Sequence, residues 1–310
     1  MDKKLSYVRA LLAVLLIPSL SFAARSEPVH VRMENVNFHV GDGVELRVLH
    51  LTGRLVGAAP GKIPTFDDVN SYVIEIDSAR VSMTMTSLTN LMNNVLFVRA
   101  DAPIKNVTVE AEGTELKQTG TLRKGVSIPF TMRASPEVTS DGKLRLHPTS
   151  IKAAGFIPKG LFDFFGVHLG SLLKVRAGSP MQVIGDDLIL DPAQALPPPR
   201  IRGKLTKAWI ADGMLFEQFG GDKPPPSITP PVASHNFMYY RGGTLRFGKL
   251  TMTDTDLMLV DEHPTDLFDF SPAHYKDQLV AGYSKSTRDG GLVTYMPDLS
   301  EVSARRTARK

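Results

Sequence analysis

The strongest constraint on this fold is the alternation of apolar and polar residues along much of the chain. Apolar residues take every second position from Val29 to Met33 and again from Val44 to Val48, with polar residues between them. Successive side chains of a β-strand point to opposite faces, so this alternation places the apolar ones against a core. The pattern therefore predicts strands that each have one buried face.

The same pattern continues through residues 72–85, and glycine-containing turns then separate further strands. The glycines of Arg241-Gly-Gly-Thr indicate one such turn, and the last strand is expected to break near Lys249. The strands predicted after residue 85 are 106–112, 115–123, 126–133, 143–153, 180–184, 187–190, 202–210, 214–219, 237–240 and 244–260.

Two segments change from this period of two to the spacing of a helix. The first begins at Thr86 or Ser87, both of which are suitable N-cap residues. Its apolar residues, three or four positions apart, are Leu88, Leu91, Met92 and Val95. This spacing predicts a helix with one apolar face.

The second segment, residues 158–175, is the most apolar helix candidate of the chain. Asp163, Gly170 and Lys174 share one narrow stripe, and leucine and phenylalanine cover most of the remaining surface. A helix that is apolar nearly all round is buried or faces something other than water. It is shorter than the roughly 20 apolar residues that a membrane span requires. We expect a sheet to wrap this helix, or the helix to cover a lipid.

Residues 1–23 predict export. Lys3, Lys4 and Arg9 accompany a short apolar run, and small residues indicate cleavage after Ala23. The alternative is an uncleaved membrane anchor, for which the apolar run is short. The chain has no cysteine, which excludes disulfides and a lipidated-cysteine anchor. We expect a periplasmic or secreted bacterial protein.

The remaining organisation is one elongated domain, residues 27–262, with proline-rich connectors at 196–200 and 223–231 and a C-terminal extension at 263–310. The basic end of this extension is a solvated tail or a segment attracted to an anionic membrane surface. Nucleic-acid binding is not expected, because the chain has a single tryptophan and is expected to be exported.

Catalytic motifs are weak. Ser171 and Lys174 have the Ser-x-x-Lys spacing of penicillin-binding enzymes, and Ser234-His235-Asn236 resembles their second motif, but Lys-Thr-Gly is absent. The polar stripe of the apolar helix explains Ser171 and Lys174 better. We therefore expect a protein that is not an enzyme.

Acidic residues gather near the C-terminal part of the chain. A divalent cation needs several oxygens that converge at defined spacing, usually with a glycine for a sharp turn. Residues 257–260 separate the acidic groups as a strand would, so turn and strand-edge carboxylates are the preferred interpretation, and we expect no metal or cofactor. The residues concerned are Asp254, Asp256, Asp261, Glu262, His263, Asp266 and Asp269.

The order of elements over residues 70–220 resembles the LmeA-like lipid-binding proteins of bacteria. These are similar to the tubular lipid-binding families typified by bactericidal/permeability-increasing protein and to AsmA-like proteins. The resemblance implies an α+β fold in which a long, strongly curved antiparallel β-sheet wraps around one or two apolar helices, with acyl chains in the groove. It is carried by Asn106-Val-Thr-Val-Glu, Ile128-Pro-Phe-Thr-Met, Asp141-Gly-Lys-Leu-Arg-Leu, Ile151-Lys-Ala-Ala-Gly-Phe-Ile-Pro, the apolar helix and Asp187-Leu-Ile-Leu-Asp-Pro.

The function expected from these features is non-catalytic binding or transfer of a phospholipid or another acyl-chain amphiphile in support of the cell envelope. One alternative is a structural or interaction protein of the envelope without a lipid ligand. Another is a hydrolase whose residues converge only in three dimensions. The residues expected to line the lipid groove are Leu88, Leu91, Met92, Val95, Phe162, Phe165, Leu169 and Leu172.

Overall fold

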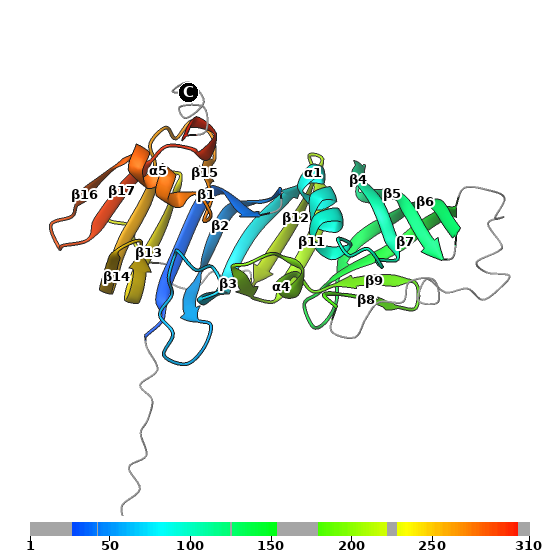
Figure 1. Ribbon diagram of the computed structural model, residues 1–310, viewed down its shortest axis with the longest axis horizontal. Helices are drawn as coiled ribbons and strands as arrows, with labels where there is room; N and C mark the ends of the chain where they lie inside the picture. The colour runs from blue at the N-terminus through cyan, green and yellow to red at the C-terminus, as the bar shows by residue number, and fades with distance from the viewer. Residues whose placement is uncertain (1–26, 42, 125, 154–178, 222–227, 303–310) are drawn as a thin grey trace, which may run out of the picture.

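The computed structural model describes residues 27–41, 43–124, 126–153, 179–221 and 228–302 of the chain. Over these residues the protein is elongated, with two β-sheets following each other along its long axis (Figure 1). Strands dominate and the described helices are short, so the prediction of a strand-rich fold is confirmed. The helix expected at 158–175 lies outside the described residues.

The larger sheet contains 11 of the described strands, in the order β11-β12-β3-β2-β1-β13-β14-β17-β16, with β10 beside β3 and β15 beside β1. It is a mixed sheet, because β10, β15 and β17 each pair in parallel with a neighbour, so the expectation of a purely antiparallel sheet is wrong here. Its strands are β1 (Val29–Gly41), β2 (Val44–Gly57), β3 (Tyr72–Thr84), β10 (Arg200–Arg202), β11 (Leu205–Ala211), β12 (Met214–Gly220), β13 (Phe237–Phe247), β14 (Leu250–Asp261), β15 (Phe268–Phe270), β16 (Tyr283–Ser286) and β17 (Leu292–Met296).

The smaller sheet is antiparallel throughout and contains six described strands in the order β4-β5-β6-β7-β9-β8. The turn glycines predicted from the sequence form its hairpins: Gly113 and Gly185 have φ values of 64° and 62°, which glycine adopts without steric cost. The predicted positions of these strands are confirmed. They are β4 (Ile104–Glu112), β5 (Glu115–Lys124), β6 (Val126–Val138), β7 (Leu144–Ala153), β8 (Met181–Ile184) and β9 (Asp187–Leu190).

The three long strands β1, β2 and β3 each change their burial phase near the middle. On β1 the buried residues are odd-numbered up to Met33 and even-numbered from Val36, and between them Asn35 has a φ of 50°. Register shifts between β2 and β3 mark the corresponding changes on those strands. Such irregularities bend a strand and keep its apolar side chains on one face. The face that these strands bury is therefore apolar over their whole length.

β13 continues through Gly242 and Gly243, where the sequence predicted a turn. Both glycines have positive φ values, 77° and 56°, so the strand is kinked here without ending. A Cβ atom on Gly243 would lie 2.4 Å from the carbonyl oxygen of Glu27, which leaves room only for glycine. The chain turns instead at Gly248, next to the break predicted at Lys249.

A short helical segment, α1 (Met85–Asn90) and the π-helix η1 (Leu91–Leu96), connects the two sheets in sequence. Its N-cap is Thr84, whose hydroxyl accepts a hydrogen bond of 3.1 Å from the Ser87 N–H. The helix therefore begins earlier than the predicted Thr86 or Ser87. Leu88 and Leu91 are buried in one hydrophobic core to which both sheets contribute.

The segment expected as a C-terminal extension adds strands to the larger sheet. β15 pairs with β1, and β17 pairs with β14, with the helix α5 (Tyr275–Ala281) between them in sequence. Phe268, Phe270 and Tyr275 are fully buried by this arrangement. The sheet thus continues beyond residue 262, where the sequence placed the end of the domain.

Candidate functional site

An apolar groove lies on the buried face of β1, β2, β3 and β12. Its walls are apolar except for the carboxyl group of Glu217, which belongs to β12. The other lining residues are Met33, Phe38, Val40, Leu46, Val48, Leu51, Ile74, Ile76, Val81, Leu196, Pro199, Ile201 and Phe219. This composition suits the hydrocarbon part of a ligand.

One wall of the groove is a segment here called the strap: it consists of the helix α4 (Pro192–Ala195), the residues up to Pro199 and the short strand β10, which belongs to the same sheet. Leu196, Pro199 and Ile201 of the strap line the groove directly. The free volume beside it is about 40 Å³, far less than an acyl chain occupies. An acyl chain can therefore enter only if part of the lining moves.

The strap is held by apolar packing, since Pro192 and Ala195 are buried, and by a small number of polar interactions. β10 pairs with β3 at three positions, and Arg202 forms an ion pair of 2.6 Å with Glu75 on that strand. At its start, the Asp191 side chain caps α4 by accepting a hydrogen bond from the Ala193 N–H. Local displacement of the strap leaves the ladder between β1, β2, β3 and β12 intact.

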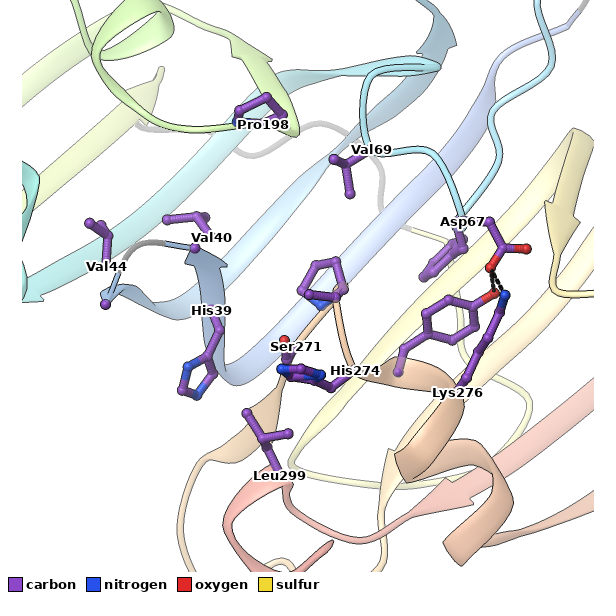
Figure 2. Close-up of a pocket in the computed structure, with 16 residues that line it drawn as sticks. His39, Val40, Val44, Asp67, Val69, Pro198, Ser271, His274, Lys276 and Leu299 are labelled. Carbon is purple, nitrogen blue, oxygen red and sulfur yellow. Dashed lines mark hydrogen bonds and ion pairs between the residues drawn. The ribbon is translucent and has the colours of Figure 1, made fainter. Parts of the chain in front are cut away.

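The groove adjoins a larger and more polar cavity, shown in Figure 2 and here called the mouth. Its volume is about 610 Å³, Val40 lines both spaces, and Pro198 of the strap faces the mouth while its neighbour Pro199 faces the groove. The strap therefore separates an apolar floor from a polar entrance. The polar residues of the mouth are His39, Asp67, Ser271, His274 and Lys276.

One side of the mouth carries an ion pair. Asp67 accepts hydrogen bonds from the Tyr275 hydroxyl, at 2.9 Å, and from the ammonium group of Lys276. The Lys276 hydrogen bond lowers the pKa of Asp67, and burial raises the pKa of Tyr275. Asp67 is thus a carboxylate and Tyr275 a neutral phenol across the physiological range.

The opposite side carries His39, which contacts Asp269 through Nε2 and lies 3.6 Å from Glu45 through Nδ1. The hydrogen bond to Asp269 raises the pKa of His39. Burial raises the pKa of Asp269, but the hydrogen bond and the charge of His39, together with hydrogen bonds from the Asn37 side chain and the Ser300 N–H, lower this pKa overall. A protonated imidazole held by two carboxylates has no free lone pair, so His39 is poorly suited to act as a general base.

Glu217 is the residue that sequence reasoning missed in the groove. Its side chain points to the same face as the apolar Leu215 and Phe219, and only 8% of the residue is exposed. Among the described residues it has no hydrogen-bond or ion-pair partner. Burial raises its pKa to about 7. An acid at an apolar position of an alternating strand was the signal that could have revealed it.

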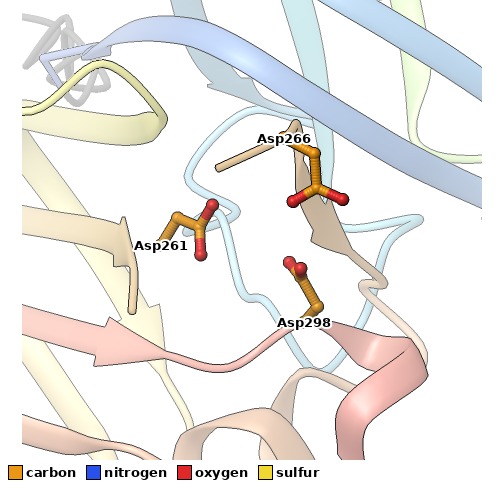
Figure 3. Close-up of side chains that lie close together, drawn as sticks. All are labelled: Asp261, Asp266 and Asp298. Carbon is orange, nitrogen blue, oxygen red and sulfur yellow. The ribbon is translucent and has the colours of Figure 1, made fainter. Parts of the chain in front are cut away.

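A second group of titratable residues lies near the other end of the larger sheet, where the carboxylates of Asp261, Asp266 and Asp298 face one another (Figure 3). Their oxygens lie within 4.8 Å of one another. Burial raises the pKa of Asp298 to about 7 and also raises that of Asp261. Such a set can share protons or hold a cation. The sequence pointed to Asp261 and Asp266, but not to Asp298.

The structure places the predicted groove residues partly elsewhere. Leu88, Leu91 and Met92 are buried in the core near β4, and Val95 packs against that core. These four residues line neither the groove nor the mouth described above. Phe162, Phe165, Leu169 and Leu172, together with the polar Ser171 and Lys174, lie outside the described residues.

Comparison with known proteins gives no family, since no family model, curated protein or solved structure matches this chain. In the part of the chain that the structure describes, no helix has the length and apolarity needed to cross a membrane. The site therefore has to be interpreted from its own geometry.

Proposed function

We propose that this protein binds or transfers a phospholipid or a related acyl-chain amphiphile without catalysis, with the chain in the apolar groove and the polar end at the mouth. The observation that carries the proposal is that an almost wholly apolar groove and a more polar cavity of about 610 Å³ adjoin at Val40, which lines both. Amphiphiles have the same division into an apolar and a polar part.

The energetics of such binding follow from the groove's lining. Each methylene transferred from water to an apolar surface contributes about 0.8 kcal/mol, so a chain of ordinary length provides enough free energy to offset displacement of the strap. The bound acyl chain would take the place of Leu196, Pro199 and Ile201 in contact with the groove floor. We infer that the strap opens as a unit, because only the three residues of β10 pair with β3.

The mouth offers charges of both signs for a headgroup. Lys276 and the protonated His39 are cationic, and Asp67 is anionic. A zwitterionic or anionic headgroup fits this set, while affinity comes mainly from the chain.

The proposal also retains three expectations from the sequence. These are export to the periplasm or the exterior, a sheet that curves around apolar helices, and a contribution of residues 158–175 to the lipid-binding surface. The alternative remains an envelope protein that binds no lipid and uses its exposed strands or tail to contact a partner.

A disulfide that fixes the strap to β3 tests where the acyl chain binds. Val73 on β3 and Arg200 on β10 are directly paired, only half-buried and exposed respectively, and neither lines the groove. Because the chain has no cysteine, the double variant Val73→Cys/Arg200→Cys can form no other disulfide within one molecule, and the monomeric oxidised form is the one to be assayed. We expect the oxidised protein to lose uptake of a fluorescent phospholipid from vesicles, and the reduced protein to retain it.

The reduced double variant is the matched control for folding and for both substitutions. Equal uptake in the oxidised and reduced forms would place the ligand outside the groove. Native mass spectrometry of wild-type protein purified from its own host provides the broader test. If no lipid is bound and no lipid moves between vesicles, the proposed function is wrong.

A further inference from the structure

We propose that Glu217 is a specificity-determining residue. Its carboxyl group accepts a hydrogen bond from, or donates one to, a hydroxyl group on the acyl chain of the ligand. This inference rests on the proposed function, since it concerns which amphiphile the groove selects. It is carried by a polar side chain without a partner, set in the floor of a groove that is otherwise apolar.

The register of the sheet fixes where this group lies. Glu217 is paired with Val81 on β3 and with Ala208 on β11, so both of its neighbours across the strands are apolar. Leu215 and Phe219, two positions away on the same strand, point to the same face and are buried. The carboxyl group is thus surrounded by hydrocarbon and opens onto the groove.

Glu217 differs from the other buried acids of the described residues, which are Asp261 and Asp298. The Asp261 carboxylate accepts hydrogen bonds from the Asn236 side chain at 3.1 Å and from the His263 N–H at 2.9 Å. Asp298 accepts one from the Asp269 N–H at 2.8 Å. Glu217 has no such donor among the described residues, and a buried polar group without a partner is costly.

The uncharged lining around Glu217 indicates which ligand group can bind to its carboxyl group. Among the described residues, no charged side chain other than Glu217 lines the groove, so an ammonium group there would lose its hydration with a single counter-ion. A hydroxyl carries no charge, and it can donate to a carboxylate or pair with a protonated carboxyl group. The raised pKa of about 7 allows both forms near neutral pH.

The position of Glu217 also indicates how far along the ligand this hydroxyl lies. The mouth is reached at Val40 on β1, and β2 and β3 lie between β1 and β12. Neighbouring strands are about 4.8 Å apart, so Glu217 lies about 14 Å across the sheet from β1. The hydroxyl is therefore expected well along the chain, away from the headgroup.

The test is competition against a fluorescent fatty acid bound to the full-length wild-type protein. The competitors are octadecanoic acid, its isomer series hydroxylated near mid-chain, the isomer hydroxylated next to the carboxyl group, and octadecylamine. We expect one mid-chain isomer to compete about ten-fold more strongly than octadecanoic acid, as one additional buried hydrogen bond to an acid provides. The isomer hydroxylated next to the carboxyl group should show no such gain.

Two variants test whether Glu217 causes the preference for the mid-chain hydroxyl. Glu217→Leu should abolish the preference for the mid-chain hydroxyl. Glu217→Gln should keep the preference, because an amide also donates and accepts. Glu110→Gln, a change of an exposed acid on β4, is the matched control and should behave as wild type.

The outcomes separate this inference from the proposed function. If wild type binds octadecanoic acid but shows no preference for any hydroxylated isomer, the inference about Glu217 is wrong and the lipid groove stands. Preferential binding of octadecylamine, lost in Glu217→Leu, would overturn the choice of a hydroxyl. If none of the chains binds to any form, the proposed function itself fails.

Discussion

The groove floor and the aspartate cluster each contain a buried acid whose pKa is raised to about 7, but the two acids are placed very differently. Glu217 stands alone among hydrocarbon side chains. Asp298 faces two other carboxylates and accepts a backbone hydrogen bond. The comparison shows that burial alone, or burial together with neighbouring carboxylates, can raise the pKa of an acid to about 7.

The two regions also differ in what they leave for a ligand. In the cluster, the Asn236 amide and the backbone N–H groups of His263 and Asp269 supply donors to the carboxylates. In the groove, no described residue supplies a donor to Glu217. Glu217 can therefore bind a hydrogen-bonding group of a ligand, whereas the cluster carboxylates already have donors. Measuring how each acid affects stability tests this difference.

The largest expected effect is at Asp298. Its folded-state pKa of about 7 is well above the ordinary value of 3.8, so the folded protein binds the proton more tightly and stability falls as pH rises through this window. Asp298→Asn removes that loss and keeps an oxygen acceptor for the Asp269 N–H. We expect it to raise the free energy of unfolding by about 4 kcal/mol at pH 8 and to have little effect at pH 4.

Urea denaturation at the two pH values measures this change. Repeating it with a chelator tests whether a cation neutralises the cluster. If Asp298→Asn stabilises the protein at pH 8 both with and without the chelator, the cluster binds protons and no cation. If Asp298→Asn destabilises the protein until the chelator is added, a bound divalent cation holds the three carboxylates together, and the cluster is a metal site.

A somewhat smaller effect is expected at Glu217. The rise from 4.5 to about 7 has the same sign, so stability again falls as pH rises between these values. Glu217→Gln should therefore stabilise the protein by about 3 kcal/mol at pH 8, with the gain disappearing below about pH 4. Thermal or urea unfolding across this range measures it, and an unchanged pH dependence would show that Glu217 has a partner in solution.

Combining substitutions sharpens the contrast between the two regions. Glu217→Gln and Asp298→Asn concern separate sites, so their effects should add within about 0.5 kcal/mol. Asp261→Asn and Asp298→Asn concern neighbouring carboxylates, of which Asp261 raises the pKa of Asp298, so their combined gain should fall short of the sum. Additive effects within the cluster would mean that its carboxylates titrate independently.

The sequence predicted the strands well because alternation and turn glycines are local signals. The hairpins around Gly113 and Gly185 appear where the sequence placed them. The same local reasoning failed at Gly242 and Gly243, because two glycines suit a kinked strand as well as a turn. It also placed the helix start after Thr84, whose capping role depends on one hydrogen bond to Ser87.

The candidate site was less predictable, because it depends on contacts between distant parts of the chain. The strap reaches the groove only because β10 pairs with β3, more than a hundred residues earlier in the sequence. The aspartate cluster needs Asp298 to return beside Asp261 through the pairing of β17 with β14. Only Glu217 carried a local signal, an acid in the apolar phase of a strand, and that signal indicates a site without showing what surrounds it.

The smallest expected effect is at His39, which lies between the two regions, in the wall of the mouth and in contact with Asp269. Its raised pKa means that the folded protein favours the imidazolium, so this contribution to stability is present below pH 6.5 and is lost as pH rises through the folded pKa. His39→Gln should cost about 1 kcal/mol at pH 6 and less at pH 9, as measured by urea denaturation. Because the same substitution removes a positive charge from the mouth and leaves the groove unchanged, it should weaken binding of an anionic lipid more than binding of an uncharged one of the same chain length. Equal weakening for both lipids would place the headgroup away from His39 and would leave Lys276 as the cationic side of the mouth.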